Sequence, residues 1–209
     1  MTAALAADAV IRWLIAGDEA IGELRVRSPS RTDLVVRARS GDPEAFETLI
    51  RAAGDHLLAV ARKILRDPDA AEDALQQAVI RAWRRLPQLR DPDKFDRWLY
   101  RILVMACYAE ANRSRRFRSH VRTVSPAEVA RDIAATLADN EALSQAFLEL
   151  TPAHRAVVVL HHVAGLPLVE VARIVGVSHG TARSRLHYAL RSLRSALEAI
   201  DRDGPEVRR

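Results

Sequence analysis

Hydrophobic residues recur at helical spacing along most of the chain. One segment has Phe46, Leu49 and Ile50 at steps of three and one, within a longer run of polar positions. Steps of three and four residues place side chains on one face of an α-helix, whereas a half-buried strand would alternate polar and apolar residues. No such alternation occurs, so the pattern predicts an all-α fold. The next segment repeats the helical spacing at Leu75, Val79, Ala82, Trp83 and Leu86.

Helix starts are marked by a capping residue followed by proline. The pairs are Asp42-Pro43, Asp67-Pro68, Asp91-Pro92 and Thr151-Pro152. Asp and Thr accept hydrogen bonds from the first free N–H groups of a helix, and proline suits the first helical position. We therefore expect helices near 33–40, 43–65, 69–86, 93–117, 139–149, 152–164, 167–175 and 179–200.

A less amphipathic stretch divides the helical pattern in two. Residues 117–138 mix small, polar and charged side chains around Pro126, which is typical of a linker. We predict two separately folded helical domains joined by this flexible linker: a helical bundle at 31–116 and a helix-turn-helix domain at 139–200. Residues 1–30 are expected to be a disordered or weakly helical extension, and residues 201–209 a tail.

The cations are almost all arginine. Lys63 and Lys94 are the only lysines among 32 basic residues, against 27 acidic ones. The guanidinium group of arginine is better suited than the ammonium group of lysine to bidentate hydrogen bonds with phosphate. The single cysteine, Cys107, cannot form an intramolecular disulfide, which is compatible with a reducing compartment, and we expect a cytoplasmic location by default. The N-terminal stretch fits neither a signal peptide nor a membrane span, so no membrane insertion is expected.

The stretch "VARIVGVSHGTARSRL" predicts a helix-turn-helix. Ala172 is small where two helices must approach, Gly176 suits a left-handed turn, and Ser178 can cap the next helix. No acidic residue occurs from Thr181 to Ala196. An arginine-rich helix can be a merely solvated surface, but the turn and the missing acids favour a helix that reads DNA. The predicted core face holds Ala182, Leu186, Ala189, Leu190, Leu193 and Leu197; a neighbouring cationic face holds Arg183, His187, Arg191 and Arg194.

The N-terminal half has two further candidate surfaces. The helix "DPDAAEDALQQAVIRAWRRL" carries an acidic and glutamine-rich face, which alone is compatible with simple solvation. The following helix interleaves aromatic and basic residues, a pattern that suits single-stranded nucleic acid but equally suits a helical core. We favour a place in the helical core for Phe95 and Trp98, and binding of single-stranded nucleic acid stays open as the alternative.

Taken in order, the motifs resemble a known family. The segments "SGDPEAFETL", "DAAEDALQQAVIRAW", "FDRWLYRI" and "LTPAHRAVVVLHHVAGLPLVEVARIVGVSHGTARSRLHYALRSL" are similar to bacterial sigma-70-family RNA polymerase sigma factors of the extracytoplasmic-function (ECF) group, over about 33–200. The resemblance implies a factor that binds core RNA polymerase and directs promoter recognition and transcription initiation. Its partners would be the polymerase core, promoter DNA both duplex and melted, and in many members an anti-sigma factor, whose existence this sequence does not show.

The resemblance also implies three sets of site residues. Core-polymerase binding would use Glu72, Asp73, Gln76 and Gln77. The melted minus-ten element would be held by Lys94, Arg97, Arg101, Met105, Tyr108, Arg113, Arg115 and Arg116. The duplex minus-thirty-five element would be read by Ser178, His179, Thr181, Arg183, Ser184, Arg185 and His187.

One position departs from the family. Members commonly have asparagine where this chain has Met105, and methionine cannot make the same hydrogen bonds to a base. The residues about one turn later, Ala109 and Asn112, also differ from the usual acidic and basic pair. Recognition of the minus-ten element is therefore expected to depart from the family's usual pattern.

Two other classes of function fit the sequence less well. An autonomous helix-turn-helix regulator would explain the C-terminal half but not the "EDALQQ" helix and the aromatic-basic helix after it. Catalysis is not expected, because His154, His161 and His162 match no metal-ligand spacing and Cys107 lies among apolar residues like a small buried hydrophobe. We expect no cofactor and no metal.

Overall fold

The computed structural model describes residues 30–120 and 141–203. Every regular element within these ranges is a helix, which confirms the predicted all-α class. The predictions for 1–29, for 121–140 and for 204–209 lie outside the described residues. The elements are α2 (Arg31–Arg39), α3 (Pro43–Leu65), α4 (Pro68–Arg85), η1 (Leu86–Gln88), η2 (Pro92–Lys94), α5 (Phe95–His120), α6 (Glu141–Glu149), α7 (Pro152–Val158), η4 (Val159–Val163), α8 (Leu168–Val175) and α9 (His179–Asp203).

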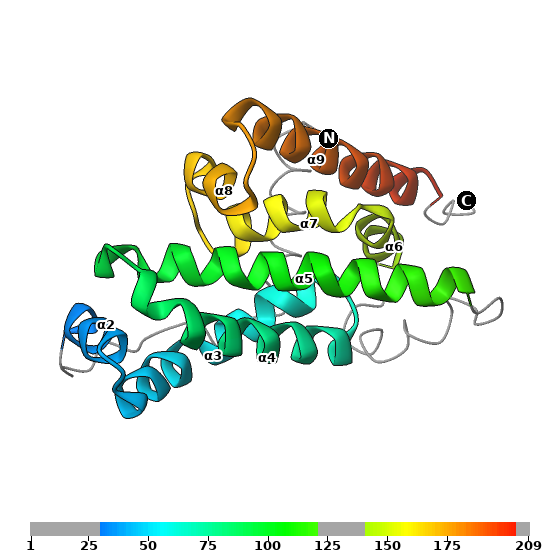
Figure 1. The fold of residues 1–209 in the computed structure, drawn as a ribbon. Helices are drawn as coiled ribbons and strands as arrows, with labels where there is room; N and C mark the ends of the chain where they lie inside the picture. Colours follow the sequence, from blue (N-terminus) through cyan, green and yellow to red (C-terminus); the bar gives the residue numbers. More distant parts are fainter. Residues whose placement is uncertain (1–29, 121–140, 204–209) are drawn as a thin grey trace.

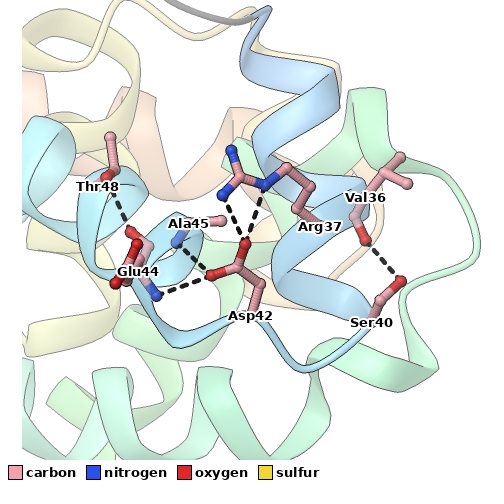
Figure 2. Close-up of polar contacts among 7 residues, drawn as sticks. All are labelled: Val36, Arg37, Ser40, Asp42, Glu44, Ala45 and Thr48. Atoms are coloured by element: carbon pink, nitrogen blue, oxygen red, sulfur yellow. Dashed lines mark hydrogen bonds and ion pairs between the residues drawn. The ribbon is translucent and has the colours of Figure 1, made fainter.

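The predicted capping pairs begin helices as expected. Asp42 accepts hydrogen bonds from the backbone N–H groups of Glu44 (3.0 Å) and Ala45 (3.1 Å), and its other oxygen accepts from Arg37 Nε at 2.9 Å (Figure 2). Asp67, Asp91 and Thr151 cap α4, η2 and α7 in the same way, each before a proline. Local side-chain chemistry thus sets where these helices start.

Two helix ends differ from the prediction. α5 continues to His120, so it enters the stretch expected to be linker. The segment expected as one helix from 152 to 164 changes at Val159 into a π-helical turn, η4, which ends at Val163 and is followed by Gly165 with φ 67°. Helix ends depend on packing as well as sequence, so shifts of a few residues are normal.

The N-terminal block is built around α5. α3 and α4 both pack on α5, and α2 packs on α3. The side of α4 that faces the block consists of alanines, which allow close approach of the neighbouring helices. Phe95, Leu99 and Leu103 of α5 are almost completely buried, so the core reading of Phe95 is confirmed.

The C-terminal block packs α6, α7 and α8 around α9. Leu193 and Ala189 of α9 are fully buried, as the predicted core face requires. Cys107, on α5 of the other block, is fully buried too, which confirms its reading as a small hydrophobe, and burial raises the pKa of its thiol to about 12.

The two blocks lie directly against each other. α5 runs through the middle of the molecule, with α3 and α4 on one side and α7 and α8 on the other (Figure 1). α3 also contacts α7 and η4, and buried residues of both blocks form one continuous hydrophobic cluster. The sequence predicted two separately folded domains; in this structure they share an interface.

Candidate nucleic-acid and polymerase interface

The helix-turn-helix is held by the turn chemistry expected from the sequence. Gly176 ends α8 with φ 73°, a left-handed conformation that glycine adopts without a steric penalty. Ser178 Oγ accepts from the backbone N–H of Thr181 at 3.1 Å and lies 2.8 Å from the Thr181 hydroxyl. These contacts fix the start of α9 relative to α8.

The predicted minus-thirty-five residues gather at the start of α9. The first turns of a helix offer free N–H groups and short polar side chains, the usual arrangement for contacts to base edges and phosphates. Arg185 is partly buried, whereas the other six predicted residues are exposed: Ser178, His179, Thr181, Arg183, Ser184 and His187.

Most of the predicted minus-ten residues form a stripe along α5. Arg97, Arg101, Met105 and Tyr108 recur at steps of three or four residues, and Arg115 follows Tyr108 after seven, so these five share one side of the helix. Met105 is 38% exposed within this stripe, which leaves its side chain available to a ligand. Lys94 precedes the stripe in η2 and forms an ion pair with Asp91 at 2.5 Å. We call the following residues the α5 stripe: Arg97, Arg101, Met105, Tyr108, Arg115 and Arg116.

Part of the α5 stripe is covered by α8. Arg97 Nη1 lies 3.2 Å from Glu170 Oε1, and both side chains are partly buried. Arg101 Nη1 donates to the backbone carbonyl of Arg173 at 3.3 Å. The helix that precedes the recognition helix therefore occupies two cations that were predicted to hold melted DNA.

Tyr108 is a half-buried member of the α5 stripe. Burial raises the pKa of its phenol to about 12, while the positive charge of Arg185 on α9 acts in the opposite direction. The Tyr108 hydroxyl is buried and has no hydrogen-bond partner among the described residues. The charge of a predicted minus-thirty-five residue thus acts on a predicted minus-ten residue.

The predicted polymerase-binding face lies on α4 and is open. Glu72, Asp73, Gln76 and Gln77 are all exposed, and they lie opposite the buried alanines of this helix. Ile80 is on the same exposed side and is 38% exposed, so the face includes an apolar residue that the sequence reading missed.

Two arginines contact the carboxylates of that face. Arg62 Nη2 lies 3.0 Å from Glu72 Oε1, and Arg113 Nη2 lies 3.1 Å from Asp73 Oδ2. Arg113 also pairs with Glu110. A residue predicted for DNA therefore contacts one predicted for polymerase, which no signal in the sequence indicated.

The histidines of the C-terminal block have structural contacts. His154 Nδ1 lies 2.6 Å from Thr151 Oγ1, and its ring lies 4.9 Å from that of Tyr188. His161 Nδ1 lies 2.8 Å from the carbonyl of Leu166. Burial lowers the pKa of both His154 and His162. Nowhere in 30–120 or 141–203 do three or more His, Cys, Asp or Glu side chains gather closely enough to hold a metal ion.

These features define an all-helical protein with a C-terminal helix-turn-helix, a cationic and aromatic long helix, and an acidic and amide-rich helix face. Over the same described residues, none of the helices combines the length and apolar character needed to cross a membrane.

Comparison with known proteins identifies the family. Two family models match: Sigma-70 region 2 over residues 49–119 and Sigma-70, region 4 over residues 146–195. An RNA polymerase sigma-E factor of Streptomyces avermitilis is 33% identical over 169 residues, covering 81% of this chain and 94% of that protein. The ECF RNA polymerase sigma factor SigL of Mycobacterium tuberculosis is 31% identical over 170 residues, covering 77% and 96%. The chain belongs to the sigma-70 family of RNA polymerase sigma factors, in its ECF group.

Solved structures share the fold. CnrH, in complex with the cytosolic domain of CnrY, matches with a TM-score of 0.59 at 24% identity, over 82% of this chain and 99% of CnrH. The sigma factor RpoE of Bartonella quintana, in complex with the anti-sigma factor NepR, matches with a TM-score of 0.58 at 22% identity, over 73% and 96%.

Proposed function

We propose that this sigma factor binds core polymerase through the open face of α4. Glu72, Asp73, Gln76 and Gln77 present charge and amide groups to solvent from one side of a helix that is anchored by alanines on the other. Ile80 adds an apolar contact at the end of this face. Interfaces are stabilised by such mixtures, with polar groups that orient a partner around apolar contacts.

The α5 stripe, with Lys94 and Arg113 beside it, binds the melted minus-ten element. Guanidinium groups can follow the backbone of a single strand, and the exposed Met105 and half-buried Tyr108 offer surface against which unpaired bases pack. Opening a promoter costs a few kcal/mol per unstacked base, which such contacts offset.

The start of α9 reads the duplex minus-thirty-five element. Arg183 is exposed at the start of the second turn of α9, where arginine can form bidentate hydrogen bonds with guanine. The seven residues assigned to this contact are Ser178, His179, Thr181, Arg183, Ser184, Arg185 and His187.

Simultaneous contact with both promoter elements requires α8 to leave α5. Arg97 and Arg101 are engaged by α8 in the present arrangement, so they become available to DNA only when the two blocks separate. Two tethered readers then gain affinity jointly when the promoter spacing fits both.

The remaining assignments follow from this function. The chain acts in the cytoplasm, where it assembles with polymerase, and it contributes binding rather than catalysis and needs no cofactor. An anti-sigma factor is a fitting further partner, by comparison with the B. quintana complex. The observation that carries the proposal is that a chain of this family exposes polar faces on α4 and at the start of α9, each suited to a different partner.

Run-off transcription with purified core polymerase on a pool of genomic promoters tests the proposal. Asp73→Ala should weaken assembly with the core, and Gln76→Ala should do so without removing the contact to Arg113. Arg183→Ala should abolish dependence on the upstream element, with a loss of about tenfold on promoters that have it.

Asp55→Ala and Arg51→Ala, both exposed on α3, are the matched controls. Activity of Asp73→Ala and Arg183→Ala equal to these controls would contradict the assignments. Specific duplex binding by the isolated chain, with no effect on polymerase, would indicate an autonomous regulator instead.

A further inference from the structure

Two arginines, one from each block, contact the end of α6 where the blocks join. Arg66 caps α3 in the N-terminal block, and its guanidinium carbon lies 5.9 Å from the centre of the Phe147 ring on α6. Arg155 on α7 is only 7% exposed. The charge of Arg66 acts on Arg155 and helps to lower its pKa, after the larger effect of burial. Both guanidinium groups therefore lie against adjacent residues of α6, Arg66 over the Phe147 ring and Arg155 against the carbonyl of Leu148.

Neither guanidinium has an acidic partner among the described residues. Arg155 Nη1 donates to the carbonyl of Leu148 at 3.3 Å, but Nε of Arg155 and Nε of Arg66 are buried and lack a hydrogen-bond acceptor there. Burial lowers the pKa of both groups, yet each stays protonated at neutral pH. A buried cation without a counter-charge is destabilising, and such an unsatisfied group calls for a bound water or ion.

The backbone conformation of Arg66 is also unusual. Its φ of 60° is the only positive value at a non-glycine residue within 30–120 and 141–203. Residues held in the left-handed region are uncommon and cluster at binding sites. Arg66 adopts this conformation as the C-cap of α3, and it is the residue whose guanidinium lies over Phe147.

We propose that Arg66 and Arg155 form a binding site for a small oxyanion of the phosphate class, which bridges the two blocks. Two guanidinium forks match the geometry of a tetrahedral oxyanion, and each hydrogen bond is assisted by charge. Arg155 is too deeply buried to meet the backbone of a DNA duplex, so a small ion is the fitting occupant. The bound anion neutralises the repulsion between the blocks and stabilises their packed arrangement.

Inorganic phosphate is the probe. Thermal unfolding of the full chain is followed at increasing phosphate, against sodium chloride of equal ionic strength, and binding is measured directly by calorimetry. Phosphate should raise the unfolding temperature with saturation, since a ligand that binds only the folded state stabilises it. Arg66→Gln and Arg155→Gln should each weaken phosphate binding by about tenfold or more, because one of the two charged donors is lost.

Arg84→Gln, which removes an exposed arginine of α4, is the matched control and should keep the full effect. It also accounts for the general stabilisation that phosphate gives to proteins by exclusion from their surface. Arg66→Gln decides the outcome if Arg155→Gln does not fold, because Arg66 lies at the partly exposed side of the pair.

An equal phosphate effect in Arg66→Gln and wild type, or an equal effect of chloride, would overturn the proposal. The measurement uses neither polymerase nor promoter. Failure of the phosphate experiment can therefore be distinguished from failure of the transcription experiment.

Discussion

The guanidinium of Arg97 on α5 lies 3.2 Å from the carboxylate of Glu170 on α8, an ion pair that joins the two helical blocks. Arg97 belongs to the surface assigned to melted DNA, whereas Glu170 belongs to the helix that supports the DNA reader. DNA and α8 therefore compete for the same cation.

Glu170→Gln should increase the affinity of the free chain for single-stranded minus-ten DNA by about fivefold, since a partly buried pair contributes about 1 kcal/mol. The substitution releases Arg97 without removing any assigned DNA contact. Fluorescence anisotropy of a labelled oligonucleotide, without polymerase, measures the change.

Glu47→Gln is the control, because Glu47 pairs with Arg51 on the exposed side of α3 and its loss changes the net charge equally. If both variants bind DNA equally well, charge alone explains the gain and α8 does not compete.

Met105→Asn should give the minus-ten reader a hydrogen-bonding side chain and a sharper base preference. One hydrogen bond is worth about 1 kcal/mol, so discrimination at one promoter position should rise about fivefold. Sequencing of transcripts from a randomised minus-ten library measures it. Met105→Leu, which stays apolar, should leave the preference unchanged, and equal profiles for both variants would show that this position does not contact a base.

The stability of α3 should depend on pH through Asp42. Hydrogen bonds from Ala45 N–H, then the contact with Arg37, hold the pKa of Asp42 below its ordinary value of 3.8. A carboxylate whose pKa is lower in the folded state stabilises it fully above the unfolded pKa, and this contribution is lost as the pH falls through the folded value.

Asp42→Ala should therefore lower the free energy of unfolding at pH 7, and the difference from wild type should shrink as the pH falls below 3.8. Urea unfolding at several pH values measures it. Asp55→Ala, on the exposed side of α3, serves as the comparison, and a difference for Asp42→Ala that is independent of pH would contradict the role of its charge.

Alanine substitutions at two glycines should change the stability of the chain in opposite directions. Gly176 has φ 73°, so Gly176→Ala should destabilise the chain by about 1–2 kcal/mol. Gly54 is helical, and a Cβ there meets no atom within 4 Å, so Gly54→Ala should stabilise by about 0.5–1 kcal/mol. Urea unfolding of both variants measures the change in the free energy of unfolding. Changes of the same sign in the two variants would contradict the backbone conformations assigned to these glycines.

Local chemistry made much of the fold predictable. The capping pairs such as Asp42-Pro43, the helical spacing and the Gly176 turn depend on residues a few positions apart, and each appears in the structure as predicted. The core reading of Phe95 also holds, because the period of a helix shows which residues share its buried side. The family could be recognised for the same reason, since its motifs are short local patterns.

The sequence by itself thus determined the helices, their caps and turns, and the faces they expose. Only the tertiary structure decided that α8 lies on α5, that Arg113 contacts Asp73, and that Arg66 lies over Phe147 of α6. These contacts join residues far apart in the chain, and a charge pattern does not specify which of many arginines meets which partner. Packing of the two hydrophobic blocks brings them together, and packing depends on the whole surface of each block.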